Sequence, residues 1–71
     1  MENKKERFIR IAENRTNKII DMLNLLGNCS NKSNYDYSEE DVKRIFTAIE
    51  NSTRICKMKF LDKQEKTKFK L

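Results

Sequence analysis

The feature that most constrains the fold is a pair of segments in which apolar residues recur at the spacing of an α-helix. In residues 4–26 this spacing joins Phe8, Ile11, Ala12, Ile19, Met22, Leu23 and Leu26. In residues 39–61 it joins Val42, Phe46, Ile49, Thr53, Cys56 and Phe60. The chain has no proline, one glycine and no strand-like alternation, so nothing interrupts either segment. The sequence therefore predicts an all-α protein with two helices, at about 4–26 and 39–61.

The ends of the two segments carry recognisable signals. Gly27 followed by Asn28 predicts the end of the first helix. Ser38 predicts the start of the second, because a serine caps free N–H groups and the acidic residues after it suit the positive end of the helix dipole. We expect an antiparallel hairpin over residues 1–61, with a long Asn- and Tyr-rich loop. Residues 62–71 alternate charges with few apolar residues, so we expect a basic tail that frays in isolation.

A chain of 71 residues is too short to bury a large core. Its two cysteines and the absence of histidine exclude a four-ligand zinc site built from the favoured ligands. Cys29 lies beside the loop, whereas Cys56 lies about 27 Å along the second helix, too far for a bridge within one chain. We expect Cys56 in the core and Cys29 as a loop thiol. Self-association remains as the source of stability, and we predict a homodimer that forms a four-helix bundle.

The apolar stripes also suggest a register for the hairpin. Antiparallel packing across the loop places Ile19 near Phe46 and Phe8 toward Cys56. Arg15 interrupts the first stripe where an apolar residue is expected. We favour an arrangement in which its stem packs on the seam and its guanidinium pairs with Glu50.

The residue inventory argues against catalysis. Without histidine, a serine or cysteine nucleophile lacks its commonest base. The cluster of Glu39, Glu40 and Asp41 is better explained as first-turn helix acids. We predict no enzyme activity, no catalytic residue, no metal site and no cofactor. The chain shows no apolar leader and no apolar run of about 18 residues, which predicts a cytoplasmic protein without a membrane partner.

Charge is distributed unevenly along the chain. The net charge is +5, and residues 1–18 and 54–71 carry the positive excess whereas residues 36–50 are acidic. A hairpin would bring the two basic segments together at its open end, where they could attract a polyanion. The candidate nucleic-acid-binding residues are Lys4, Lys5, Arg7, Arg10, Arg54, Lys57, Lys59, Lys63, Lys66 and Lys68. Charged helix faces are often only solvated surface, and the chain carries no zinc-finger, phosphate-loop or RNP-type motif.

The loop over residues 27–37 offers a second candidate site. Its length exceeds that of most helix connections, which is typical of binding loops. The candidate partner-binding residues are Asn28, Asn31, Asn34, Tyr35 and Tyr37. The alternative is structural: asparagine and serine satisfy the backbone of turns, and the tyrosines fold back on the hairpin. We favour this alternative for Tyr37, which precedes the cap where a hydrophobic staple packs.

One stretch resembles a known group of proteins. The residues Leu25 to Asn31, Asn34 to Tyr37, Asp41-Val42 and Ile45-Phe46 are similar to short proteins of bacterial phages, plasmids and conjugative elements. The resemblance implies an accessory role, such as regulating element genes or disabling a host defence nuclease, and either role requires binding.

Three functions therefore remain open. The leading hypothesis is a binding protein for nucleic acid or a nucleoprotein. The alternative is a protein–protein inhibitor or adaptor that uses the loop. A weaker third hypothesis is attachment to an anionic membrane through the basic C-terminal segment, in which Phe60, Phe69 and Leu71 are interspersed.

Overall fold

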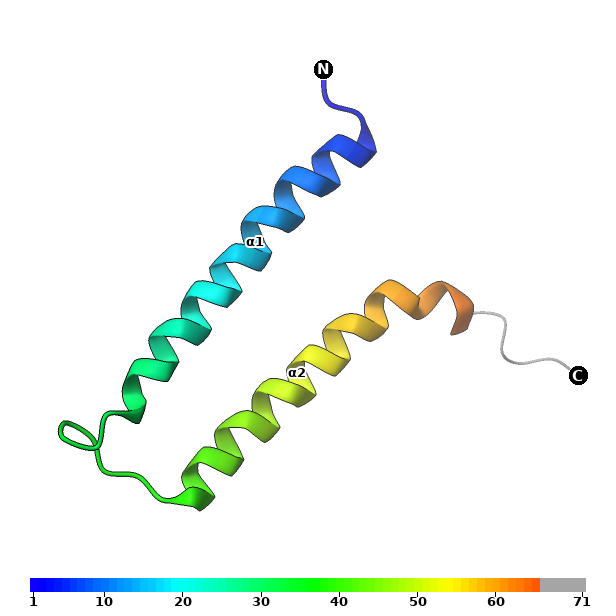
Figure 1. The fold of residues 1–71 in the computed structure, drawn as a ribbon. Helices are drawn as coiled ribbons and strands as arrows, with labels where there is room; N and C mark the ends of the chain where they lie inside the picture. The colour runs from blue at the N-terminus through cyan, green and yellow to red at the C-terminus, as the bar shows by residue number, and fades with distance from the viewer. Residues whose placement is uncertain (66–71) are drawn as a thin grey trace, which may run out of the picture. The chain divides into compact units, whose positions relative to one another are not determined.

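The computed structural model describes the backbone of residues 1–65 and the side chains of residues 1–61. The chain divides into two units, Met1–Asp36 and Tyr37–Leu71, and each is considered by itself. Figure 1 shows helix α1, over Lys4–Gly27, and helix α2, over Glu39–Glu65. A short 3-10 turn, η1, follows α1 over Asn28–Ser30. All regular structure within residues 1–65 is helical. The prediction of an all-α protein with two helices is confirmed.

A capping box starts α1. The Asn3 side-chain oxygen Oδ1 accepts a hydrogen bond from the Glu6 backbone N–H at 2.7 Å, and Glu6 Oε1 accepts one from the Asn3 N–H at 3.1 Å. The two bonds satisfy N–H groups that have no partner inside the helix. Residues 3 to 6 read Asn-Lys-Lys-Glu, the cap-x-x-Glu pattern of such a box. This cap was not among the predicted helix signals, although its pattern is present in the sequence.

The end of α1 lies one residue beyond the predicted position, and its geometry is not that of a glycine stop. Gly27 is the last helical residue, with φ −59° and ψ −28° in the right-handed region. Asn28 is the C-cap, and its N–H donates to the carbonyls of Leu25 and Leu26. The chain therefore leaves α1 by tightening into η1. No glycine of the described residues has a positive φ.

The second helix starts as predicted. Ser38 Oγ accepts a hydrogen bond from the Asp41 N–H at 3.1 Å, and Asp41 Oδ2 accepts one from the Ser38 N–H at 2.9 Å. The first turn contains Glu39, Glu40 and Asp41, whose charges complement the positive end of the helix.

The far end of α2 differs from the prediction. The helix continues to Glu65, four residues beyond the predicted end at about residue 61, whereas the expected fraying of the tail stays a prediction. The absence of proline and glycine from residues 39–65 permits the extension. Residues 66–71, the remainder of the predicted tail, lie outside the described residues.

Neither helix buries its apolar stripe. Among the described residues none is fully buried. Six are partly covered: Ile11, Ala12, Leu26, Tyr37, Val42 and Ile49. A single helix cannot cover its own apolar side, which needs a second surface. Cys56, which we expected in a core, is accordingly exposed, as is Cys29. The hairpin, its Arg15–Glu50 pair and the bundle stay predictions.

Candidate nucleic-acid interface

Two lysines occupy the first turn of α1 against the helix dipole. Lys4 and Lys5 are the first two helical residues, and Glu6 is the only acid in that turn. Partial positive charge accumulates at a helix N-terminus, so cations there lower helix stability by about 0.3 to 1 kcal/mol each at low salt. Lys5 gains a partial offset, because its Nζ lies 5.8 Å from the centroid of the Phe8 ring, within cation–π range. Helix stability therefore does not explain this pair of lysines.

Arg10 already has an anionic partner. Its Nε donates to Glu2 Oε2 at 2.6 Å and its Nη2 donates to Glu2 Oε1 at 2.9 Å, which makes a two-point ion pair. The hydrogen bonds lower the pKa of Glu2 and raise the pKa of Arg10. Both side chains are exposed, so the pair adds little stability. A phosphate would nevertheless have to displace Glu2, which makes Arg10 a weaker candidate than Lys4, Lys5 or Arg7.

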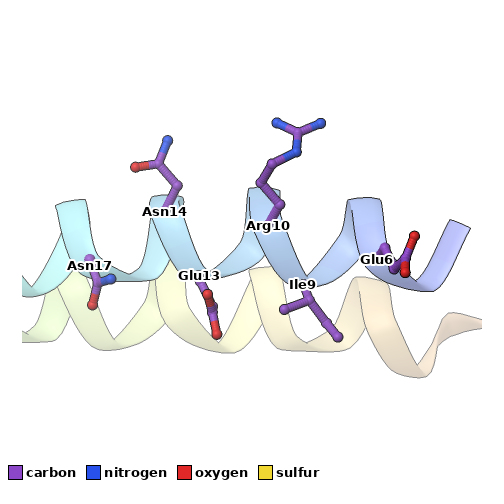
Figure 2. A pocket seen from close by; sticks show the side chains of 6 residues that line it. All are labelled: Glu6, Ile9, Arg10, Glu13, Asn14 and Asn17. Atoms are coloured by element: carbon purple, nitrogen blue, oxygen red, sulfur yellow. The ribbon is translucent and has the colours of Figure 1, made fainter. Parts of the chain in front are cut away.

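A shallow hollow lies beside Arg10 on α1. Figure 2 shows Arg10 and Asn14 extending to the same side of the helix, with Ile9 and Glu13 pointing away from them. The residues that line it all come from α1: Glu6, Ile9, Arg10, Glu13, Asn14 and Asn17. One helix cannot enclose a ligand, and the two glutamates outnumber the arginine. The hollow is therefore a surface furrow between side chains, and its charge does not suit an anion.

The basic residues of α2 do not share one face. At about 100° of rotation per residue, Arg54 and Lys57 lie on one side of the helix and Lys59 lies on nearly the opposite side. All three are exposed. They lie six to eleven residues before Glu65, outside the last turn of α2, so the helix dipole neither favours nor opposes them appreciably. The side chain of Lys63, and Lys66 and Lys68 entirely, lie outside the described residues.

The positive excess is concentrated at the two ends of the chain. Residues 37–65 hold six basic and six acidic residues, whereas residues 1–36 hold seven basic and five acidic. The remaining charge comes from the three lysines of residues 66–71, which include no acid. Of the described residues, 51–61 hold three basic residues and no acid, and 1–10 hold four basic residues and two acids. Only at the start of α1 do the cations lie against the helix dipole.

In the loop, two of the candidate asparagines serve the backbone. Asn31 Oδ1 accepts a hydrogen bond from the Ser33 N–H at 2.9 Å. The Asn31 carbonyl accepts from the N–H groups of Asn34 at 3.1 Å and Tyr35 at 3.0 Å. The Asn28 carbonyl in turn accepts from the Asn31 N–H at 3.4 Å. The side-chain contact of Asn31 fits the structural explanation of that residue, in which asparagine organises a turn. The contact of Asn28 is made by its backbone carbonyl, which any residue would supply.

The two loop tyrosines differ in exposure. Tyr35 is 51% exposed, and its neighbour Asn34 is exposed as well. Tyr37 is only partly exposed, as is Val42 in the first turns of α2. These two residues occupy the positions on either side of the Ser38 cap that a hydrophobic staple joins, which fits the structural explanation of Tyr37. Every candidate loop residue except Tyr37 is exposed, and Tyr35 is the aromatic side chain among the exposed ones.

The part of the chain that the structure describes contains neither a cluster of metal ligands nor a membrane-spanning helix. Within it, no three side chains of histidine, cysteine, aspartate or glutamate lie close enough together to hold a metal ion. Neither helix, over the residues described, contains the long apolar stretch that a bilayer crossing requires. Comparison with known protein families, characterised proteins and solved structures finds no match to this chain.

Proposed function

We propose that this protein is a non-enzymatic helical binding protein that contacts nucleic acid or a nucleoprotein, as a cytoplasmic accessory factor of a mobile genetic element. The observation that carries the proposal is the pair Lys4 and Lys5 in the first turn of α1. A helix under selection for stability alone places acids there. A polyanion that contacts this turn gains from both lysines, from Arg7 and from the positive end of the helix.

The proposal includes a hairpin that enlarges this basic surface. Glu50 is the only acidic residue of α2 between residues 42 and 61, and Arg15 is the only charged residue inside the apolar stripe of α1. Pairing the two across the seam satisfies both charges and sets the register of the helices. That register brings Lys57 beside the start of α1. Two such hairpins then form a four-helix bundle, which covers the stripes that each helix exposes.

Charge reversal of the two lysines tests the proposal. In the double variant Lys4→Glu, Lys5→Glu we expect the affinity for labelled DNA or RNA to fall at least about tenfold at low salt, because two phosphate contacts become repulsive. The slope of log affinity against log salt should shrink by about two. Acids in the first turn suit the helix dipole, so circular dichroism should show unchanged or higher helicity. A loss of binding then cannot be attributed to unfolding.

A matched control carries the same change in net charge at another place. In Lys43→Glu, Arg44→Glu, two exposed cations next to the acidic start of α2 are reversed, and we expect a much smaller loss of affinity. Equal losses in the two double variants would show that only net charge matters. Wild-type binding that does not respond to salt would refute phosphate contact altogether.

The second candidate function is a protein–protein inhibitor or adaptor, and one observation favours it. The turn that Asn31 organises leaves Tyr35 51% exposed, and tyrosine is a frequent anchor of protein interfaces. For this function, Tyr35→Ala abolishes capture of a protein from nuclease-treated extract. Reversal of Lys57, Lys59 and Lys63 leaves that capture intact. Loss of binding when the three lysines are reversed, together with unchanged binding in Tyr35→Ala, supports nucleic-acid binding instead.

A further inference from the structure

Helix α2 carries a second strip of residues beside its apolar seam. The seam consists of Val42, Phe46, Ile49, Thr53, Cys56 and Phe60. Roughly 100° around the helix lies what we call the second strip, with alternating spacings of four and three: Asp41, Ile45, Ala48, Ser52, Ile55 and Lys59. All six are exposed, and Ile45 and Ile55 keep 40% and 55% of their surface accessible. The hairpin of the proposed function would use the seam and leave the second strip uncovered.

We propose that a second copy of this chain docks antiparallel on the second strip. From Asp41 to Lys59 the strip consists of an acidic residue, an isoleucine, two small residues, a second isoleucine and a basic residue. Two copies laid antiparallel about its midpoint place Asp41 against the partner's Lys59, Ile45 against the partner's Ile55, and Ala48 against the partner's Ser52. Each contact occurs twice, as a two-fold symmetric interface requires. The inference deepens the four-helix bundle of the proposed function by naming its surface, and it does not depend on the basic start of α1.

The side chains suit such an approach. Ala48 and Ser52 at the centre allow the two helix axes to come near the lower end of the usual separation of about 8 to 10 Å. The two isoleucine pairs then exclude water on either side of the centre. At each end, Asp41 uses Oδ2 to accept the Ser38 N–H at 2.9 Å, and its other oxygen can accept from the partner's lysine.

Charge also selects the orientation. A parallel pair would set Asp41 against its own copy at one end and Lys59 against its own copy at the other, and like charges at such positions are unfavourable. The antiparallel pair replaces both repulsions with attractions. A second copy of this chain is thus the occupant whose charges complement the strip without any further assumption about its chemistry.

The area of the strip sets the expected strength. From Asp41 to Lys59 the helix rises about 27 Å, and a contact about 10 Å wide covers roughly 270 Å² on each copy. A stable interface needs about 800 Å² per partner. The strip alone provides about a third of that area. We therefore expect a dimer that dissociates on dilution.

Sedimentation velocity on the full chain tests the interface. We expect dimers that dissociate on dilution, and a dissociation constant at least about tenfold higher in Ala48→Glu, because a carboxylate enters the closest point of the interface. The control Thr47→Glu places the same charge on the neighbouring exposed residue, off the strip, and should leave the constant unchanged. A monomer at all accessible concentrations overturns the proposal, and so do equal effects of the two variants.

Cross-linking tests the orientation. In a Cys29→Ser, Cys56→Ser background, the pair Ala48→Cys, Ser52→Cys should form a covalent dimer when oxidised, and Ala48→Cys alone should cross-link much more slowly. Equally fast cross-linking by the single variant indicates a parallel pair and overturns the proposal. Salt-dependent binding of a polyanion is measured on the same samples. Failure of the dimer with retained polyanion binding refutes this inference and the bundle but leaves the polyanion contact standing, whereas a dimer without polyanion binding refutes the polyanion contact and leaves this inference standing.

Discussion

Replacing Gly27 with alanine tests the geometry at the end of α1, because the two possible conformations predict opposite signs. Gly27 has φ −59° and ψ −28°, and a Cβ added to it meets no atom within 4 Å. In that right-handed conformation alanine lowers the entropy of the unfolded chain and stabilises the helix by about 0.5 to 1 kcal/mol. In the left-handed conformation of many glycine stops, the same Cβ costs about 1 to 2 kcal/mol.

The assay is thermal unfolding followed by circular dichroism. For a domain of this size, about 1 kcal/mol corresponds to a shift of roughly 4 to 8 °C, so Gly27→Ala should raise the midpoint by about 2 to 8 °C. The matched control is the pair Asn24→Ala and Asn24→Gly, at an exposed position three residues earlier in α1. The alanine–glycine difference should have the same sign at both positions. A lower midpoint for Gly27→Ala would refute the right-handed end of α1.

Two further predictions concern the helix starts. Asn3→Ala and Ser38→Ala each remove the cap of one helix and should destabilise the protein by about 1 kcal/mol, whereas Asn3→Asp and Ser38→Asp should retain most of the stability. The thermal unfolding midpoint of each variant measures the effect. Unchanged midpoints in the alanine variants would contradict the capping boxes. Because the hydrogen bond to Arg10 lowers the pKa of Glu2, the ion pair stabilises the start of α1 above the unfolded pKa of Glu2, and this stabilisation is lost as the pH falls through the lower folded pKa. An NMR titration of Glu2 should show a midpoint below the usual glutamate value, which returns to that value in Arg10→Gln; the same midpoint in both proteins would show that the pair does not form.

The helices could be predicted because their signals are local. Spacing of apolar residues gives the two segments, and Ser38 with the acids after it gives the start of α2. The start of α1 carries an equally readable pattern in Asn3 and Glu6, but the helix was predicted from its apolar spacing alone, without a cap. The far end of α2 was placed about four residues too early, because the alternation of charges after residue 61 was interpreted as the start of a tail.

For the candidate sites, the sequence indicates which types of residue are present, but not which contacts they make or on which face of a helix they lie. The sequence could not foretell that Arg10 is held by Glu2, since that contact depends on how the three residues before α1 fold back. Nor does a count of basic residues show that Lys59 lies on the opposite side of α2 from Lys57, which follows from the helical rotation between them. Cys56 is exposed because a single helix cannot bury its own apolar side. Local sequence patterns do not show which surface, if any, covers that side.

The shared basic surface and the bundle both depend on α1 and α2 packing antiparallel, and one distance tests that packing. Spin labels at Asn14 and Asn51, both exposed, are placed in a cysteine-free chain diluted with unlabelled protein. Packed helices have axes about 10 Å apart, so pulsed electron resonance should give a narrow distribution below about 30 Å once label reach is included. A broad distribution centred at about 55 Å would contradict the hairpin, because that distance is the rise of 37 residues along one continuous helix.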